Sequence, residues 1–479
     1  MRERKTGASR QRGGAASTAR EACAPSPTLR VLDAVLLTVG LVLGAGIFKA
    51  PSVVAAQLGS ESALMIAWLL GGVASLIGAL CYAELASTWP HPGGDYHYLH
   101  RALGQGPAFL FAWARLTVIP TGSIALLAFV FGDYVSQLAP LGAYSSSVYA
   151  AAVVVGLTAM NVAGVQQGTR AQNLLTALEV LGVGAIIVVG LLLAPAPTQP
   201  PPIASAAPMG TWGMALIFVL LTYGGWNEVA CLSAEVRGPR RNLAWALLVS
   251  IGVVTTLYLL VNWAYLRGLG LAGMASSEAV AADLAQRALG SGGAQALCVL
   301  VAVSALTSAN ATVLTGARTH YAFGCDSVLF QGLGRWHGRA NTPTRALLVQ
   351  GALSLALVGL GTVTRQGFQT MVEYTAPVFW LFFLLTGVSL LVLRLREPRA
   401  HRPFRVPLYP LTPLLFVGTC AYVLYSSLAY AGPGALAGMA VLGTGAVLLA
   451  LERMRRGRSR QRSSRGPRPS HLQQPKEET

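Results

Sequence analysis

Long apolar segments dominate this sequence and restrict its fold more than any other feature. Runs of about 20 apolar residues, enough to cross a bilayer as a helix, recur from Val31 to Leu451. Charged residues make up only 11% of the chain, against about 25% in an ordinary soluble protein. The expected spans, about twelve in all, are 31–57, 62–88, 106–139, 147–164, 171–194, 211–236, 242–265, 292–323, 345–362, 368–396, 407–429 and 433–452. We therefore predict an all-α polytopic membrane protein.

The net charge of +17 is divided unevenly between the two sides that these spans define. Basic residues collect in both tails and in alternate loops, whereas the loop 193–208 carries no charge. Cytosolic loops of membrane proteins show this excess of Lys and Arg. With an even number of spans, we expect a multi-pass protein of the cell (inner) membrane with both termini in the cytoplasm. Nucleic acid is not expected as a partner, because no nucleic-acid-binding fold accompanies the charge.

The predicted organisation is one membrane domain between two tails. The membrane domain covers 31–452, and the basic tails at 1–30 and 453–479 should be disordered because they are poor in apolar residues. Within the domain, the Pro- and Gly-rich stretch at 89–104 should form a turn and then a short surface helix. The six cysteines include no CxxC pair, and neither a metal site nor a cofactor is predicted.

Two of the predicted spans are interrupted by glycines. The first span contains GAG at 44–46, and the sixth contains YGGWNE at 223–228. Each interruption lies in the first helix of a possible five-span repeat, 31–194 or 211–396, with two extra helices at 407–452. Glycine-interrupted helices at matching positions of two halves indicate the central site of a transporter. For either interruption alone, close packing of small residues against a neighbouring helix is an equally good explanation.

An unwound helix inside a bilayer is tolerated where it lines a cavity or is buried in protein. Its free N–H groups, at the positive end of a half-helix, can hold a carboxylate. The nearby free carbonyl groups can hold an ammonium group. The pattern thus favours a zwitterionic ligand such as an amino acid. Lys49, just after the first interruption, is long enough to reach the outer surface.

Several motifs resemble the amino acid–polyamine–organocation superfamily, and within it the L-type amino acid transporters and their bacterial relatives. The resemblance extends from about Arg30 to Leu451. Its motifs, in chain order, are VGLVLGAGIFKAP in the first span, PGGDYHYL at 92–99, TYGGWNEVACLSAEVRGPRRNL at 222–243, ANATVLTGARTHYAFGCD at 309–326 and EYTAPVFWLFFLLTGVSLLVLRLREPRAHRPFRVPLYP at 373–410.

The resemblance implies a leucine-transporter-type fold, with two inverted five-helix repeats and two further helices. It also implies that the first interruption binds the α-carboxylate of an amino acid and that Leu221–Gly224 receives the α-amine. Tyr223 and Trp226 would shape the side-chain pocket, although rings at this spacing are as often part of a core. The substrate-binding residues implied in this way are Gly44, Ala45, Gly46, Ile47, Leu221, Tyr223, Gly224, Gly225, Trp226 and Asn227.

Two positions depart from the family pattern. Leu221 stands where L-type transporters often have an aromatic gate, and Glu179 stands where many relatives have a lysine in span five. A carboxylate inside a membrane helix must be paired or protonated. Glu179 is therefore our candidate for proton coupling or for direct cation binding. The alternative is a structural role, in which Glu179 pairs with Arg170 or reaches the cytoplasmic end of the span.

Further charged residues follow the second interruption. Glu228 is a second candidate for carrying a proton or touching substrate, and capping of the half-helix is the alternative. Glu235 lies near Arg240 and Arg241 at the inner end of span six, where we expect a gate or interface ion pair.

These observations predict a secondary amino acid transporter that works by alternating access, either as an exchanger or as a proton symporter. Neutral substrates are favoured because the candidate acidic residues are few; cationic amino acids or polyamines are the alternative. A non-transporting amino acid sensor with the same fold is the rival from another class. An enzyme is not expected, because HExxH and GxSxG stretches are missing from the sequence. The sequence does not identify an accessory subunit.

Overall fold

The computed structural model describes residues 35, 38–40, 42–91, 93–164, 169–195, 209–228, 241–327, 329–337, 342–429 and 432–464. Within these residues the chain folds into helices, and its one extended pairing is an isolated bridge between His337 and Thr342. The predicted all-α class is therefore confirmed.

The helices follow the apolar segments of the sequence. In chain order they are η1 (Ala45–Phe48), α3 (Ala50–Gln57), α4 (Glu61–Thr88), α5 (Asp95–Leu103), α6 (Gln105–Thr117), α7 (Ile119–Leu138), α8 (Ser145–Val162), α9 (Thr169–Val188), the π-helix η2 (Val189–Leu193), α10 (Met209–Thr222), α11 (Arg241–Ser276), α12 (Val280–Asp326), α13 (Thr344–Thr364), α14 (Gly367–Arg396), α15 (Leu411–Ala429) and α16 (Pro433–Ser464). In the described part of the chain, nine helical segments are long and apolar enough to cross a membrane. The two shorter apolar segments, Ala177–Leu193 and Thr211–Thr222, match predicted spans five and six.

Three helices extend well beyond the spans predicted for them. α11 and α12 extend into the segment between spans seven and eight, and each contains a glycine with positive φ, Gly270 at 71° and Gly290 at 75°. At each glycine the chain kinks between two helical stretches. α16 continues to Ser464, so the part of the predicted C-terminal tail up to this residue is helical.

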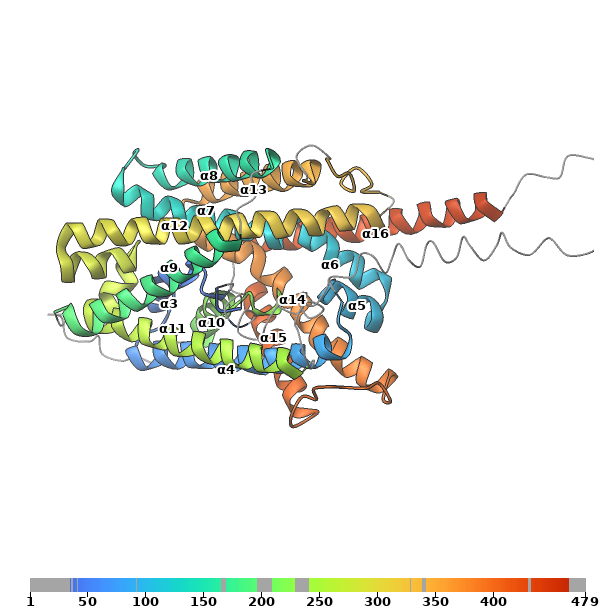
Figure 1. Ribbon diagram of the computed structural model, residues 1–479, viewed down its shortest axis with the longest axis horizontal. Helices are drawn as coiled ribbons and strands as arrows, with labels where there is room; N and C mark the ends of the chain where they lie inside the picture. The colour runs from blue at the N-terminus through green and yellow to red at the C-terminus, as the bar shows by residue number, and fades with distance from the viewer. Residues whose placement is uncertain are drawn as a thin grey trace, which may run out of the picture.

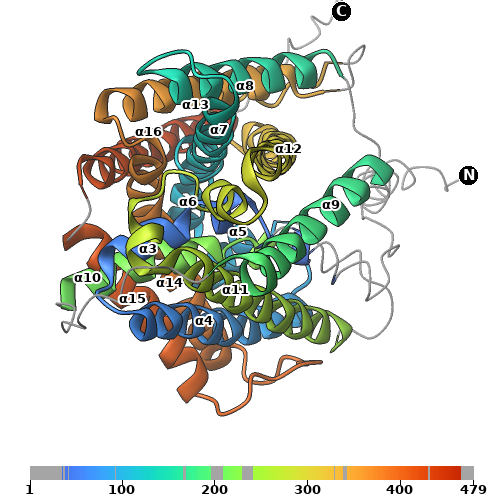
Figure 2. The ribbon, with the colours of Figure 1, turned by 90° about the vertical axis from the view of Figure 1, so that its left-hand side faces the viewer.

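The helices form one elongated bundle (Figure 1). α4 and α11 pack together on one side, and α8 and α13 pack together on the opposite side (Figure 2). The combined α6–α7 segment and α14 are the most deeply buried membrane helices, with 72% and 61% of their apolar windows covered by protein. α5 lies towards the end of the bundle from which α16 projects (Figure 1).

A buried ion network ties α4 to α14 at this end. The carboxylate of Glu84 is fully buried and accepts hydrogen bonds from Nε and Nη2 of Arg394 at 2.7 and 2.5 Å. The Arg402 guanidinium lies 3.3 Å from the same carboxylate, and the backbone N–H of Val406 donates to it at 2.7 Å. The carboxylate is thus well supplied with donors, which a buried charge requires.

Candidate functional site

The first helix break is formed by an extended glycine followed by a short turn. Gly44 has φ −69° and ψ 174°, and the 3₁₀ turn Ala45–Phe48 starts directly after it. Because Ala45 and Gly46 open this turn, their N–H groups have no acceptor inside it. A Cβ placed on Gly44 would meet nothing within 4 Å, so there is open space beside this residue.

The second helix break requires glycine for steric reasons. α10 ends at Thr222, and the N–H of Gly224 then donates to the carbonyl of Leu221 at 3.0 Å. A Cβ on Gly224 would lie only 2.9 Å from that carbonyl oxygen. Gly225 has a φ of 109°, which L-residues with a side chain rarely adopt. The two glycines therefore permit the turn that stops α10.

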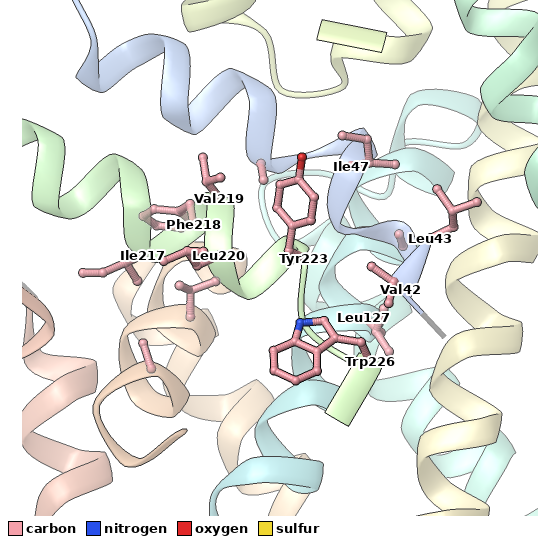
Figure 3. Close-up of a cluster of buried hydrophobic side chains, with 14 of the residues drawn as sticks. Val42, Leu43, Ile47, Leu127, Ile217, Phe218, Val219, Leu220, Tyr223 and Trp226 are labelled. Atoms are coloured by element: carbon pink, nitrogen blue, oxygen red, sulfur yellow. The ribbon is translucent and has the colours of Figure 1, made fainter. Parts of the chain in front are cut away.

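The two breaks meet in space. A Cβ on Gly46 would lie 3.3 Å from Cγ2 of Thr222, the last residue of α10. The hydroxyl of Tyr258, on α11, lies 2.7 Å from the carbonyl oxygen of Val42 and 3.2 Å from that of Thr222. Figure 3 shows Val42, Leu43 and Ile47 of the first break across from Tyr223 and Trp226 of the second.

The two aromatic residues of the second break have different surroundings. Tyr223 is fully buried in an aromatic cluster with Trp68 and Tyr258, and its hydroxyl donates to the carbonyl of Trp68 at 3.1 Å. It therefore belongs to the packed core in this conformation. Trp226 packs edge-on against Tyr82 at 5.1 Å, and together with Gly224 it lines a small cavity of about 10 Å³, room for about one water molecule.

The remaining residues implied by the resemblance surround these features. Ala45 and Ile47 are fully buried, Asn227 is buried, and Leu221 is half-buried. Other residues that line the cavity beside Trp226 include Phe379, Trp380, Phe383, Phe416 and Leu220. The wall next to Trp226 is thus mainly apolar and aromatic.

Glu228 forms an ion pair with a residue that the sequence analysis missed. Nη1 of Arg115, on α6, donates to Oε1 of Glu228 at 2.7 Å, and Nη2 lies 3.4 Å from Oε2. The backbone carbonyl of Arg115 in turn lies 2.9 Å from Nε2 of His320 on α12. A lone charged residue within an apolar span such as α6 was the signal available in the sequence.

Glu179 lies between α9 and α12 and is only 4% exposed. The hydroxyls of Ser304 and Ser308, one turn apart on α12, both donate to Oε1 of this carboxyl group, the second at 3.4 Å. The carboxyl group is thus held by neutral hydroxyl donors. The side chain of Arg170, the alternative partner considered above, lies outside the described residues.

Comparison with known proteins identifies the family of this chain. The amino acid permease family matches residues 29–447. The chain belongs to this family. The permease is 31% identical to the b(0,+)-type amino acid transporter 1 of Homo sapiens over 387 residues, 79% of this chain and 78% of the relative. It is 30% identical to the Asc-type amino acid transporter 1 of Mus musculus over 422 residues, 85% and 78%. It is 29% identical to the cystine/glutamate transporter of Homo sapiens over 411 residues, 84% and 80%. The superfamily and the L-type likeness read from the motifs are confirmed.

Four further charged residues follow the two breaks in the sequence: Lys49 after the first, and Glu235, Arg240 and Arg241 after the second. Glu235 and Arg240 lie outside the described residues, and Arg241 starts α11 without a described side chain. Lys49 does not extend freely to the surface: its Nζ lies 2.9 Å from Asp133 on α7 and donates to the carbonyl of Glu278 at 2.6 Å. Lys49 therefore connects the first break to α7 and to the segment between α11 and α12.

Proposed function

We propose that this permease is a secondary active transporter of amino acids, with neutral substrates preferred, that works by alternating access in the cell membrane. The observation that carries the proposal is the meeting of the two helix breaks at Gly46 and Thr222. Unwound backbone from two half-helices offers N–H groups and carbonyl groups in one place, as a zwitterion requires. The names of the relatives, all amino acid transporters, support the same class of substrate.

In this proposal the α-carboxylate binds at the N–H groups of Ala45 and Gly46, in the open space beside Gly44. The α-amine binds at carbonyl groups next to the end of α10. The apolar wall around Trp226 supports a neutral rather than a charged substrate side chain. The end of the bundle that carries α5 and the projecting α16 faces the cytosol, in agreement with the distribution of positive charge.

Coupling is assigned to Glu179. This carboxyl group is buried and held by two serine hydroxyls, with no cation within ion-pair distance among the described side chains. Such an environment favours a protonated carboxyl group, which releases its proton when the site opens to water. Proton symport through Glu179 follows from this; obligatory exchange is the alternative mode for the same substrate site.

The test uses purified permease in liposomes. Uptake of a mixed set of labelled amino acids is recorded with and without an inward proton gradient, for the wild type, Glu179→Gln and the surface control Glu397→Gln. Gradient-driven accumulation that Glu179→Gln alone abolishes would support proton symport. Uptake only into preloaded liposomes, unchanged in Glu179→Gln, would make the protein an exchanger and leave Glu179 a structural role. Binding without flux would contradict transport and favour a sensor.

A further inference from the structure

Asp95 is a second buried carboxyl group, and the sequence analysis did not single it out. It is the first residue of α5 and is 8% exposed. A long hydrogen bond reaches its carboxyl group from α14: Oγ1 of Thr386 donates to Oδ1 at 3.4 Å. The hydroxyl of Tyr82, on α4, also interacts with this carboxyl group, as a hydrogen-bond donor that lowers its pKa. That hydroxyl is itself buried and favours the ionised form of Asp95.

Glu84 provides a direct comparison because it is a buried carboxylate at the same end of the bundle. Glu84 has two guanidinium groups and a backbone N–H around it. Asp95 lacks a comparable set of donors among the described residues, and burying an ionised carboxylate without such donors is costly. A protonated, neutral Asp95 avoids most of this cost, because a neutral carboxyl group is much less costly to bury than a carboxylate.

The neighbouring charges belong to the ion pair behind the second helix break. The positive charge of Arg115, on α6, lowers the pKa of Asp95, and the negative charge of Glu228, at the end of the break, raises it. The two nearby guanidinium groups of α14 are engaged elsewhere: Arg394 is bound by Glu84, and Arg396 donates to the carbonyl of Ala102. Arg115 is therefore the cation for which an ionised Asp95 would compete.

Burial is the main reason that the pKa of Asp95 is raised from 3.8 to about 7. The Tyr82 hydroxyl, Arg115 and Thr386 lower this pKa, whereas the negative charge of Glu228 raises it. On α5 itself, burial and the charges of His91, Arg101 and His100 lower the pKa of His97 to about 4, so His97 is neutral when Asp95 titrates. The charge on Asp95 therefore changes in the physiological pH range.

We propose that Asp95 is a proton-binding site whose occupancy controls the ion pair between Arg115 and Glu228, and through it the position of the second helix break. With a proton bound, Asp95 is neutral and leaves Arg115 to Glu228. Without the proton, the carboxylate competes for Arg115 and repels Glu228, which loosens the contact of the break with α6. Tyr82 transmits the same change to Trp226, since their rings pack edge-on at 5.1 Å. For its effect on transport, this inference rests on the proposed function.

The first measurement is the thermal unfolding midpoint in detergent between pH 5 and pH 8, which does not depend on transport. The folded state holds a proton on Asp95 up to about pH 7, whereas the unfolded chain releases it near pH 4. The unfolded state therefore binds fewer protons over this interval, and stability must fall as the pH rises. We expect the wild-type midpoint to fall over this range. We expect this component of the fall to be missing in Asp95→Asn, with Glu397→Gln behaving like the wild type.

The second measurement is exchange of labelled leucine in liposomes with equal pH on both sides. We expect the wild-type rate to change with a midpoint near pH 7. Because Glu179 is also proposed to bind a proton, we expect Asp95→Asn to lose the part of this change that the Glu179→Gln variant retains. Tyr82→Phe removes a hydroxyl that lowers the pKa of Asp95, so its midpoint should move to higher pH; this variant serves also if Asp95→Asn does not fold.

Loss of the Asp95 component from both pH dependences supports the proposal. A wild-type pH profile of exchange in Asp95→Asn, or an unmoved midpoint in Tyr82→Phe, overturns it. If the wild-type protein exchanges none of the amino acids offered, the proposed function fails, and the unfolding profile alone decides whether Asp95 binds a proton.

Discussion

The hydroxyl of Tyr258 lies 2.7 Å from the carbonyl oxygen of Val42, so a residue of α11 holds the end of the first helix at its break. The same hydroxyl lies 3.2 Å from the carbonyl of Thr222, where α10 ends. A tyrosine hydroxyl has one proton to donate, so it serves both carbonyl groups in turn or shares its proton between them. One buried side chain thus links the two breaks, and a movement of either half-helix changes this contact.

Replacement of Tyr258 by phenylalanine should therefore affect both stability and substrate affinity. The change removes the hydroxyl from both carbonyl groups: that of Val42 keeps the N–H of Gly44 at 2.7 Å, whereas that of Thr222 loses the donor described for it, which costs about 1–3 kcal/mol. We expect a lower unfolding midpoint and a raised KM for uptake, because the carbonyl groups near the proposed amine site are no longer fixed. Tyr374→Phe is a matched control, since the Tyr374 hydroxyl donates to the carbonyl of Thr117 at 2.9 Å away from the breaks. Equal KM values in the two variants would contradict the assignment.

The sequence was sufficient to predict the helices and the positions of both breaks. Span length follows from the thickness of the bilayer, so apolar runs locate membrane helices directly. The glycines at 44–46 and 224–225 indicated where helices stop, because glycine is unfavourable inside a helix. Of these, Gly225, with a φ of 109°, has backbone that few other residues adopt. The predicted end of the last helix, at residue 452, was wrong. The sequence beyond it is basic and polar and gives no apolar signal, yet α16 continues to Ser464.

Side-chain partners were much harder to predict than helix breaks. Tyr258 lies in an ordinary apolar stretch, and nothing local shows that its hydroxyl reaches two other helices. That Tyr223 shapes a substrate pocket stays a prediction, and nothing in the sequence indicated that its ring packs against Trp68 and Tyr258. Asp95 was visible only as part of a loop motif, because its burial depends on α4 and α14, which lie far away in the sequence.

The open space beside Gly44 leads to a prediction about substrate binding. A methyl group at this position meets no atom within 4 Å, and the φ of −69° suits alanine. Gly44→Ala should therefore fold normally but raise the KM for amino acids at least several-fold, since the methyl group occupies space proposed for the carboxylate. Gly156→Ala on α8 is the control, because its surroundings are equally open. Uptake unchanged in Gly44→Ala, with the same unfolding midpoint, would show that the carboxylate binds elsewhere.

Lys49 and Asp133 should act as a unit in holding the first helix break against α7. Their charged atoms are 2.9 Å apart, and their side chains are 14% and 21% exposed. Residues in direct contact show coupling energies of about 0.5–3 kcal/mol in double-mutant cycles. We expect Lys49→Met and Asp133→Asn to lower the unfolding midpoint, and the double variant to lower it less than the sum of the two. Strict additivity would mean that the ion pair contributes nothing to stability.

The two ion pairs at the α5 end of the bundle should differ strongly in their contribution to stability. Glu84 is fully buried between Arg394 and Arg402, whereas Arg101 and Glu397 form a bidentate pair whose side chains are 41% and 32% exposed. Removing one partner of a buried pair leaves an uncompensated charge and costs about 3–5 kcal/mol, whereas an exposed pair contributes about 0–1 kcal/mol. Glu84→Gln should thus lower the unfolding midpoint far more than Glu397→Gln. Similar losses in the two variants would show that water reaches Glu84 in the folded protein, and that α4 is not held to α14 by this network.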